Sequence, residues 1–314
     1  MRPAIVAAVL VLAGAHLLPA QTPKFSVAVD AVRLDVLVMD RGRPVPGLAI
    51  EDFELRDNGV IQRIRSVTRE EVALDAVLVL DRSDSLAGEP LQHLREAARA
   101  LAMHLSPQDR ASLLTFSHQV TRPARLSTDR AALAAALDAV TPSGATALFD
   151  AVYTALILRG QSFNRTMILV FSDGLDTASW MPPSTVIEFA RQIDAVVYAV
   201  MFGADMPSTP AATMLAWPGR APVTTVAAPK EPNVPGFLKA ITEVTGGQLL
   251  HTRRETGLRD LFVAALRDMK ARYVMTYAPE GVERTGWHAI DLRLTRKKGV
   301  LTARRGYFVA PQIP

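Results

Sequence analysis

The sequence predicts an α/β protein with a mainly parallel sheet, helices on both faces of that sheet, and a β segment at each end of the chain. Short, wholly apolar runs such as Ala76–Leu80 and Met167–Phe171 are typical of strands buried on both faces. Between such runs, segments such as Pro90–Leu105 repeat apolar residues every three or four positions, as amphipathic helices do. Residues 25–70 and 272–309 instead show the alternation of half-buried strands.

Strands and helices alternate through the middle of the chain, which favours parallel pairing with crossover helices. The expected strands are Ala76–Leu80, Ala111–Phe116, Met167–Phe171, Ala195–Phe202 and Gly247–His251. The expected helices are Pro90–Leu105, Ser127–Val140 (capped by Ser127 or Thr128), Ala147–Leu158, Ser184–Ile193, Phe237–Val244 and Leu258–Met269. The repeated prolines of Gly203–Gly236 exclude a regular helix or central strand, so this segment is interpreted as a surface excursion or a binding loop.

The two ends of the chain each contain too few strands to bury two faces alone. The expected strands are one or two within Phe25–Met39, one in Leu48–Asp57, one around Ile61–Val67, and then Arg272–Tyr277, Trp287–Leu294 and Leu301–Val309. Asp57-Asn58-Gly59 predicts a tight turn. The two ends could pair into one small β-sandwich, with the α/β domain inserted between its halves.

Composition excludes several classes of protein. The chain has 314 residues, enough for roughly two domains of about 150 residues. Its formal net charge of +4 is too small to indicate a nucleic-acid partner. It has no cysteine, which excludes disulfides and thiolate metal sites.

The amino terminus resembles a secretory signal peptide, with Arg2 before the apolar run Ala4–Leu18 and a small residue for cleavage at Ala20-Gln21. The run is shorter than the about 20 apolar residues of a membrane span, although an uncleaved anchor is the alternative. We expect a secreted or periplasmic protein with no stable membrane insertion after cleavage. The predicted division is a signal peptide (1–20), an N-terminal β segment (21–72), an α/β domain (73–270) and a C-terminal β segment (271–314).

Oxygen-bearing side chains follow the predicted strand Ala76–Leu80. Asp81, Ser83 and Ser85 are spaced by two, so they can point to one side of an extended segment. Thr146 and Asp173 can complete the same site, because ligands of open α/β sheets bind outside the carboxyl ends of the strands. Hard oxygen ligands suit Mg²⁺, with Mn²⁺ or Ca²⁺ as alternatives. Two carboxylates would roughly neutralise the ion and leave a position for a partner's carboxylate. The alternative is a strand end whose Asp and Ser only satisfy turn backbone groups.

Three stretches, Leu80–Ser85, Gly144-Ala145-Thr146 and Phe171–Gly174, resemble together the metal-ion-dependent adhesion site of von Willebrand factor type A domains, over roughly residues 74–270. The flanks look like a bacterial subgroup of secreted proteins with this domain, through Asp52-Phe53-Glu54, Asp57-Asn58-Gly59 and Arg304-Arg305-Gly306-Tyr307. The resemblance implies a Rossmann-like fold and direct metal contacts from Ser83, Ser85 and Thr146. It also implies contacts of Asp81 and Asp173 through water, and a protein ligand whose acidic side chain completes the metal shell.

The expected function is therefore a secreted, non-enzymatic binding or adhesion module that captures an acidic side chain of a partner protein. One alternative is a structural or assembly module whose metal site is non-functional or only stabilises the fold. Another is a hydrolase that uses the metal to activate water, although no nucleophile elbow and no zinc-protease helix occurs. Beside the five ligands, Asp176 and Arg82 are expected as neighbours of the metal shell, with His118 near the site.

Overall fold

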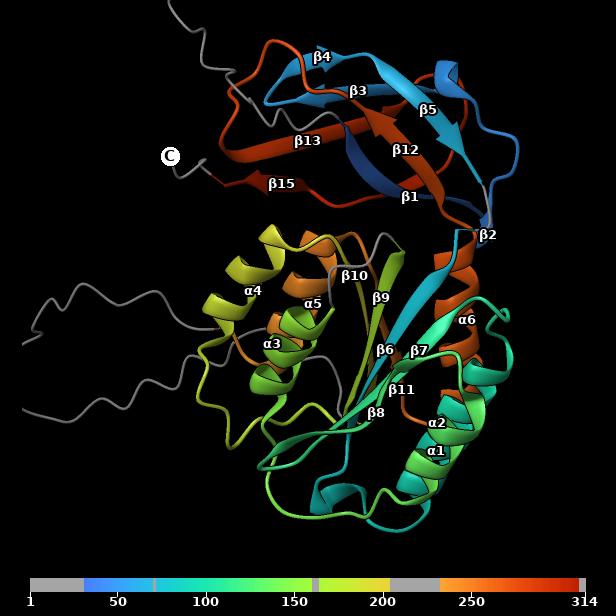
Figure 1. Cartoon of the computed structure of the whole chain (residues 1–314), viewed down its shortest axis with the longest axis vertical. Helices are drawn as coiled ribbons and strands as arrows, with labels where there is room; N and C mark the ends of the chain where they lie inside the picture. The colour runs from blue at the N-terminus through green and yellow to red at the C-terminus, as the bar shows by residue number, and fades with distance from the viewer. Residues whose placement is uncertain (1–30, 70–71, 160–163, 204–231, 311–314) are drawn as a thin grey trace, which may run out of the picture.

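The computed structural model describes residues 31–69, 72–159, 164–203 and 232–310. Figure 1 shows a β-rich unit at the top and an α/β unit below it. The predicted signal peptide and most of the proline-rich segment lie outside the described residues. Among the described residues, no helix has both the length and the apolar content that crossing a membrane requires.

A six-stranded sheet forms the centre of the α/β unit, in the order β11-β10-β9-β6-β7-β8. Its strands are β6 (Leu74–Asp81), β7 (Arg110–Phe116), β8 (Val120–Ser127), β9 (Arg165–Ser172), β10 (Val196–Phe202) and β11 (Leu249–Thr252). All neighbours are parallel except β7 and β8, which are antiparallel. Every residue of β6 and β9 is buried, which explains their continuous apolar sequences.

Helices cover both faces of this sheet, as the sequence predicts. They are α1 (Glu89–Met103), α2 (Arg130–Asp138), α3 (Leu148–Leu158), α4 (Pro183–Gln192), α5 (Val234–Thr245) and α6 (Leu258–Lys270), with short 3₁₀ turns η2 (Asp84–Leu86) and η3 (Glu255–Gly257). Helices α1, α2 and α6 pack on one face together with Leu78 and Leu80, whereas α3, α4 and α5 pack on the other with Val77 and Val79. Alternate residues of β6 thus contribute to opposite cores.

The helix predicted over Ser127–Val140 is wrong at its start, because β8 extends to Ser127. Asp129, rather than Ser127 or Thr128, caps α2 by accepting a hydrogen bond from the Ala132 amide, 2.9 Å away. Strand β8 escaped prediction because it lies at the sheet edge and buries only Ala124, so its sequence has no apolar period. An edge position also accommodates Pro123.

The two ends of the chain pair into two facing sheets, as the sequence predicts. The strands are β1 (Val32–Asp40), β2 (Arg43–Pro44), β3 (Phe53–Asp57), β4 (Val60–Gln62), β5 (Ile64–Thr68), β12 (Tyr273–Tyr277), β13 (Gly286–Leu294), β14 (Val300–Thr302) and β15 (Gly306–Val309), with a 3₁₀ turn η1 (Ile50–Asp52). One sheet has the order β14-β1-β12-β5, with β2 beside β1, and the other has the order β15-β13-β3-β4. Each sheet therefore combines strands from both ends, and their facing side chains form a third core.

Two strand predictions at the ends are corrected by this arrangement. The region Ile61–Val67 is divided into β4 and β5, and Leu301–Val309 is divided into β14 and β15, with each pair split between the two sheets. A chain that changes sheets keeps its apolar residues facing one core, so the sequence pattern does not reveal the break. The predicted tight turn between β3 and β4 is confirmed, with positive φ at Asn58 (46°) and Gly59 (83°).

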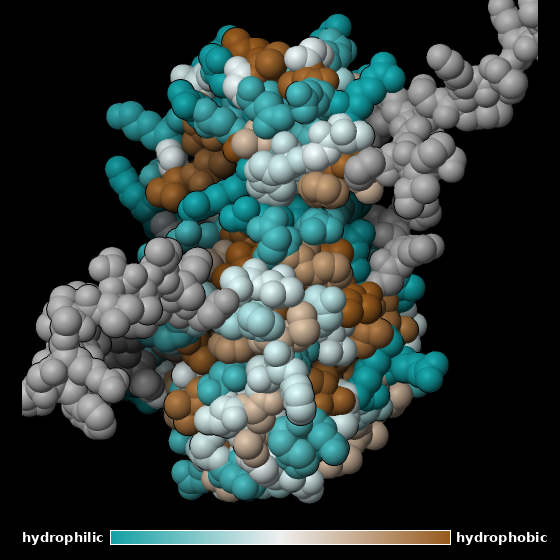
Figure 2. Space-filling view, turned by 90° about the vertical axis from the view of Figure 1, so that its left-hand side faces the viewer, coloured by the Kyte–Doolittle hydropathy of each residue, from teal (hydrophilic) through white to brown (hydrophobic). Residues whose placement is uncertain are grey.

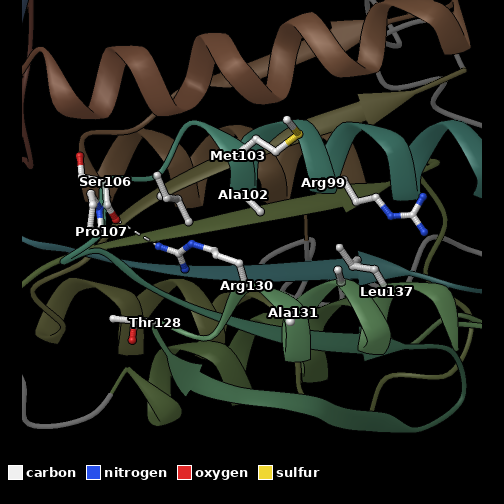
Figure 3. Close-up of a pocket in the computed structure, with 11 residues that line it drawn as sticks. Arg99, Ala102, Met103, Ser106, Pro107, Thr128, Arg130, Ala131 and Leu137 are labelled. Atoms are coloured by element: carbon white, nitrogen blue, oxygen red, sulfur yellow. Dashed lines mark hydrogen bonds between the residues drawn. The ribbon is translucent and has the colours of Figure 1, made fainter.

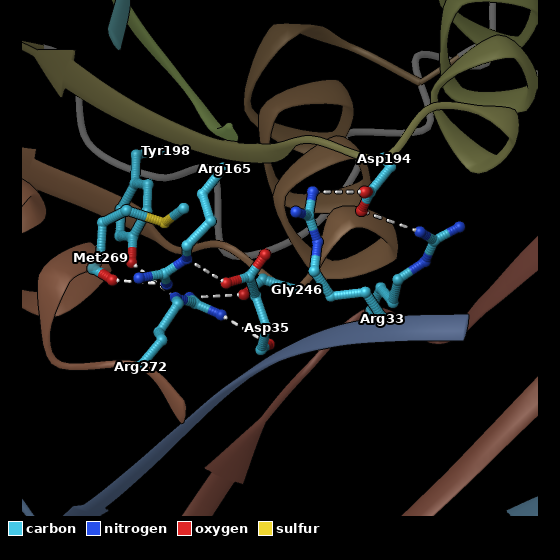
Figure 4. A network of polar contacts seen from close by, with 9 residues as sticks. Arg33, Asp35, Arg165, Asp194, Tyr198, Gly246, Met269 and Arg272 are labelled. Carbon is cyan, nitrogen blue, oxygen red and sulfur yellow. Dashed lines mark hydrogen bonds and ion pairs between the residues drawn. The ribbon is translucent and has the colours of Figure 1, made fainter. Parts of the chain in front are cut away.

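A buried polar network joins the sandwich to the α/β unit (Figure 4). Arg165, at the start of β9, donates from Nε to Asp35 of β1, 2.6 Å away. Arg272, between α6 and β12, donates to the Tyr198 hydroxyl at 3.1 Å and to the Gly246 carbonyl at 2.6 Å. This network holds the sandwich at the end of the sheet where β6 and β9 begin, so the loops that follow these strands lie at the opposite end (Figure 1).

Candidate metal centre

Three loops at the carboxyl end of the sheet carry the five predicted ligands. Strand β6 ends at Asp81, and Asp173 directly follows β9. The two strands are parallel neighbours, with Leu80 beside Phe171, so their loops leave the sheet side by side. The third loop precedes α3 and carries Thr146.

Four of the five predicted ligands are joined by consecutive hydrogen bonds. Asp81 accepts from the Ser83 amide at 2.8 Å. The hydroxyls of Ser83 and Ser85 lie 3.0 Å apart, and the Ser85 hydroxyl donates to Asp173 at 2.5 Å. The spacing of two in Asp81, Ser83 and Ser85 thus gathers their side chains as the sequence predicts.

Thr146 is placed beside this group by its backbone. The Asp84 amide donates to the Gly144 carbonyl at 3.0 Å, and the Ser143 amide donates to the Arg82 carbonyl at 2.8 Å, which fastens the Thr146 loop to the Asp81 loop. Thr146 is buried, with 3% of its surface exposed. Within the part of the chain that the structure describes, no hydrogen bond joins its side chain to the other four.

Asp81 is the most unusual group of the site. It is fully buried, and its Oδ2 has no hydrogen-bond partner among the described residues. Burial raises the pKa of this carboxyl to about 7; hydrogen bonds from Ser83 oppose the rise, and the charge of Asp173 adds to it. A buried carboxylate without a partner for one oxygen is costly, and a cation beside it would lower both the cost and the pKa.

The donor set fits a hard cation. Its two carboxylates and three hydroxyls are the oxygen ligands that Mg²⁺ and Ca²⁺ prefer. Residues 31–69, 72–159, 164–203 and 232–310 contain no group of three or more His, Cys, Asp or Glu side chains placed to hold a metal. A site here would therefore depend on the hydroxyls of Ser83, Ser85 and Thr146.

The predicted neighbours of the metal shell support the loops. Asp176 accepts from the Leu148 amide at 2.8 Å and from the Ser179 hydroxyl at 2.6 Å, so it fixes the first turn of α3. Arg82 donates to the Thr141 carbonyl at 3.1 Å, which ties it to the loop before α3. His118 is exposed, and its ring packs against Gly144, where an added Cβ would lie 2.3 Å from Nδ1.

Sequence reasoning missed how the loop between β9 and α4 is fastened to Thr146. The amides of Thr177 and Ala178 donate to the Thr146 carbonyl at 2.8 and 2.9 Å, and the Thr177 hydroxyl accepts from the Thr146 amide at 3.1 Å. Asp150 accepts from the Trp180 amide. The only available signal was the run Asp176–Ser179, whose residue types commonly bond to nearby backbone.

A groove lies elsewhere, between α1 and α2 (Figure 3). It has a volume of about 740 Å³ and is lined by residues that include Met103, Arg130 and Leu137. The Arg130 side chain reaches toward Ser106 and donates to its carbonyl at 3.2 Å (Figure 3). None of the predicted site residues lines this groove.

Comparison with known proteins agrees with the fold. Residues 76–176, which include all five predicted ligands, match the von Willebrand factor type A domain family. A von Willebrand factor type A structure from Catenulispora acidiphila shares 12% identity with a TM-score of 0.52, covering 82% of this chain and 72% of that one.

Two further solved structures show weaker similarity. The mussel byssus protein PTMP1, whose structure has a zinc-occupied MIDAS motif, is 16% identical with a TM-score of 0.49, and the match covers 68% of this chain and 49% of that one. The vWF domain of the Porphyromonas gingivalis pili tip protein Mfa5 is 25% identical with a TM-score of 0.32, over 34% and 39% of the two chains. No curated protein matches the chain. Residues 76–176 match the von Willebrand factor type A domain family, and the chain shares the fold of a solved structure of that type.

Proposed function

We propose that this protein is a non-enzymatic binding module in which a divalent cation, held by Asp81, Ser83, Ser85, Thr146 and Asp173, captures a carboxylate of a partner protein. The supporting observation is the buried Oδ2 of Asp81, which lacks a hydrogen-bond partner among the described residues although Ser83, Ser85 and Asp173 lie in one chain of hydrogen bonds beside it. The bound cation would supply positive charge and an open coordination position for the partner's oxygen.

The charges of the proposed ligands would leave the open coordination position accessible to a partner's carboxylate. Asp81 and Asp173 carry two negative charges, which a divalent ion would balance, so a third carboxylate could approach without net repulsion. Ser83 and Ser85 contribute neutral oxygens. Asp176 keeps the Thr146 loop in place through the first turn of α3. Mg²⁺ is the proposed ion, with Mn²⁺ or Ca²⁺ as alternatives.

The proposal also assigns a location and a division of the chain. The sequence of residues 1–20 supports secretion or export to the periplasm, with cleavage near Ala20-Gln21. We propose that residues 21–72 and 271–314 form the β unit and that residues 73–270 form the type A domain. In this arrangement the candidate metal centre lies at the end of the molecule farthest from the sandwich (Figure 1).

Titration calorimetry of the purified protein with MgCl₂ and MnCl₂ tests the site. We expect saturable one-to-one binding that is lost in the Asp81→Ala, Asp173→Ala variant. Asp84→Ala is the matched control, because Asp84 lies in the same loop with an exposed side chain. Equal binding by the double variant would overturn the proposed ligands.

A second titration tests carboxylate capture. We expect excess acetate to raise Mg²⁺ affinity in the unaltered protein, since acetate can occupy the open position. Mg²⁺ binding that raises the melting temperature but is indifferent to acetate and to acidic peptides would instead support a structural or assembly module.

A further inference from the structure

We propose that the loop between β9 and α4 forms an apolar contact beside the candidate metal centre, so that the partner segment carries a bulky apolar side chain at a fixed distance from its acidic residue. We call residues 173–182 the Trp180 loop. The inference rests on the proposed function, because it takes the acidic residue to be held at Asp81, Ser83, Ser85, Thr146 and Asp173.

Two large apolar side chains of the Trp180 loop face solvent. Trp180 has 91% of its surface exposed, and Leu175 has 52%. Tryptophan combines a large apolar area with few rotatable bonds, and it is over-represented among the residues that contribute most to protein–protein binding. An isolated exposed leucine is ordinary, but a nearly fully exposed tryptophan in a loop that begins at a predicted ligand is not.

The Trp180 loop is bonded directly to predicted ligands. Asp173 itself begins the loop, and its carboxylate accepts from the Leu175 amide at 3.3 Å. At the other side, the Ala178 amide donates to the Thr146 carbonyl at 2.9 Å, two residues before Trp180. Leu175 is therefore two positions from Asp173, which is a predicted ligand. Trp180 is two positions from Ala178, which is bonded to the predicted ligand Thr146.

The backbone of Trp180 is also held in place before any partner binds. Both carboxylate oxygens of Asp150 accept from the Trp180 amide, at 3.1 and 3.0 Å, and one accepts from the Met181 amide at 2.8 Å. The Ser179 hydroxyl accepts from the amides of Phe149 and Asp150. A fixed backbone lowers the entropy lost when the side chain is immobilised, so this loop suits an anchoring contact.

The loops around the candidate centre differ in character. The β6 and β7 loops contribute the basic side chains of Arg82 and His118 together with the exposed carboxylate of Asp84, whereas the Trp180 loop contributes Leu175 and Trp180. An acidic residue flanked by an apolar one complements this arrangement. Figure 2, which views the molecule from the side of α4, shows hydrophobic patches among hydrophilic residues. A local anchor fits such a surface better than a continuous apolar interface does.

Selection from a bead-displayed hexapeptide library tests the inference. Each position would be drawn from Gly, Ser, Asp, Leu and Phe, and selection would be run in MgCl₂. The unaltered protein should enrich Asp together with Leu or Phe at one fixed spacing from it. In Leu175→Ser, Trp180→Ser, Asp enrichment should persist while the apolar preference falls to the library background.

Matched controls separate this contact from general surface hydrophobicity. Ile157→Ser, Met103→Ser removes two side chains of similar exposure, 53% and 85%, from α3 and α1, and should leave both preferences unchanged. Circular dichroism and thermal unfolding would establish that each variant folds.

The outcomes distinguish the two proposals. Asp enrichment without an apolar preference, or an apolar preference that survives Leu175→Ser, Trp180→Ser, would overturn this inference and leave the proposed function standing. Absence of Asp enrichment, or Asp enrichment that persists in Ser83→Ala, Ser85→Ala, would overturn the proposed function and the inference with it.

Discussion

Arg165 of β9 and Asp35 of β1 form an ion pair across the boundary between the α/β unit and the sandwich, with Nε and Oδ1 2.6 Å apart and side chains only 4% and 8% exposed. The same guanidinium donates to the Met269 carbonyl at 2.8 Å. Both charges are thus largely removed from water, and the Arg165 guanidinium is bonded to the Asp35 carboxylate and to backbone. Removing one partner of such a pair is strongly destabilising, because the other charge stays buried without compensation.

Replacing Arg165 by Met should therefore lower the free energy of unfolding by about 3–5 kcal/mol, because Asp35 would stay buried without its partner. Urea unfolding measures the change. Arg305→Met is the control, since its pair with Glu243 is exposed and should contribute little. The double variant Asp35→Leu, Arg165→Met should recover most of the loss. If Arg165→Met were as mild as the control, the pair would not hold the two units together.

The carboxylate of Asp57 gathers three partners inside the sandwich. It accepts from the hydroxyls of Tyr277 and Tyr307, each at 2.8 Å, and lies 2.9 Å from Nδ1 of His288. Burial raises the pKa of both tyrosines, so they remain donors. Tyr307→Phe should lower the free energy of unfolding by about 1.5–3 kcal/mol, the usual contribution of a hydrogen bond to a charged group.

Guanidinium unfolding of Tyr307→Phe beside Tyr153→Phe gives the comparison. Tyr153 is only half-buried, and its ring packs on Phe189 at 5.0 Å. Tyr153→Phe should therefore lower the free energy of unfolding far less than Tyr307→Phe does. Equal effects of the two substitutions would contradict a special role for Asp57.

Asp109 should make the fold sensitive to acid. Its burial acts to raise its pKa, but hydrogen bonds from Lys270 and from the amides of Leu74 and Ser106 outweigh burial, so the pKa is lower than in the unfolded chain. The resulting stability is present above the unfolded pKa of about 3.9 and is lost as the pH falls through the lower folded value. Asp109→Asn should be less stable than the unaltered protein at pH 7, and the gap should narrow on acidification.

Measuring urea midpoints of both proteins between pH 7 and the acid limit of folding checks this. The comparison removes the contributions of other carboxylates, which titrate in both proteins. A gap that stays constant, or widens, as the pH falls would show that the Asp109 charge does not stabilise the fold.

Gly144 combines a positive φ of 70° with close packing against His118. Gly144→Ala should cost about 1–2 kcal/mol for the backbone conformation, and more if the His118 ring cannot move. Gly42→Ala is the matched control, since its φ is 76° and nothing lies within 4 Å of the added Cβ. Thermal unfolding should show a larger loss for Gly144→Ala, and His118→Ala should remove the difference. Indistinguishable losses would mean that the ring yields freely.

The central sheet could be predicted because its strands are buried on both faces. The middles of β6 and β9 are continuous apolar runs, and the residues that follow two parallel neighbouring strands meet at one edge of the sheet. For the same reason, the sequence correctly predicts that the loops carrying Asp81 and Asp173 lie side by side. Strand β8 was missed because an edge strand with one buried residue has no such pattern.

Contacts between segments distant in sequence could not be predicted. Nothing in the neighbourhood of Arg165 indicates that its side chain crosses to Asp35, 130 positions earlier. The Thr146 loop is likewise fixed by residues of the Trp180 loop, 31 positions away in the case of Thr177. Such contacts depend on which loops the topology brings together, and the local sequence around each residue does not indicate this.

The pairing of the two chain ends has a consequence for the order of folding during synthesis. Strand β1 pairs with β12, and Asp57 bonds to Tyr307, 250 positions later. The ribosome therefore releases the α/β segment complete while β1 still lacks β12 and β14 and β3 still lacks β13. Strand edges left unpaired in this way attract other chains. A chaperone that holds residues 31–69 until the last strands emerge would protect the nascent protein. Early termination near Ala271 would leave the α/β unit with an N-terminal β segment whose unpaired strand edges can bind other chains.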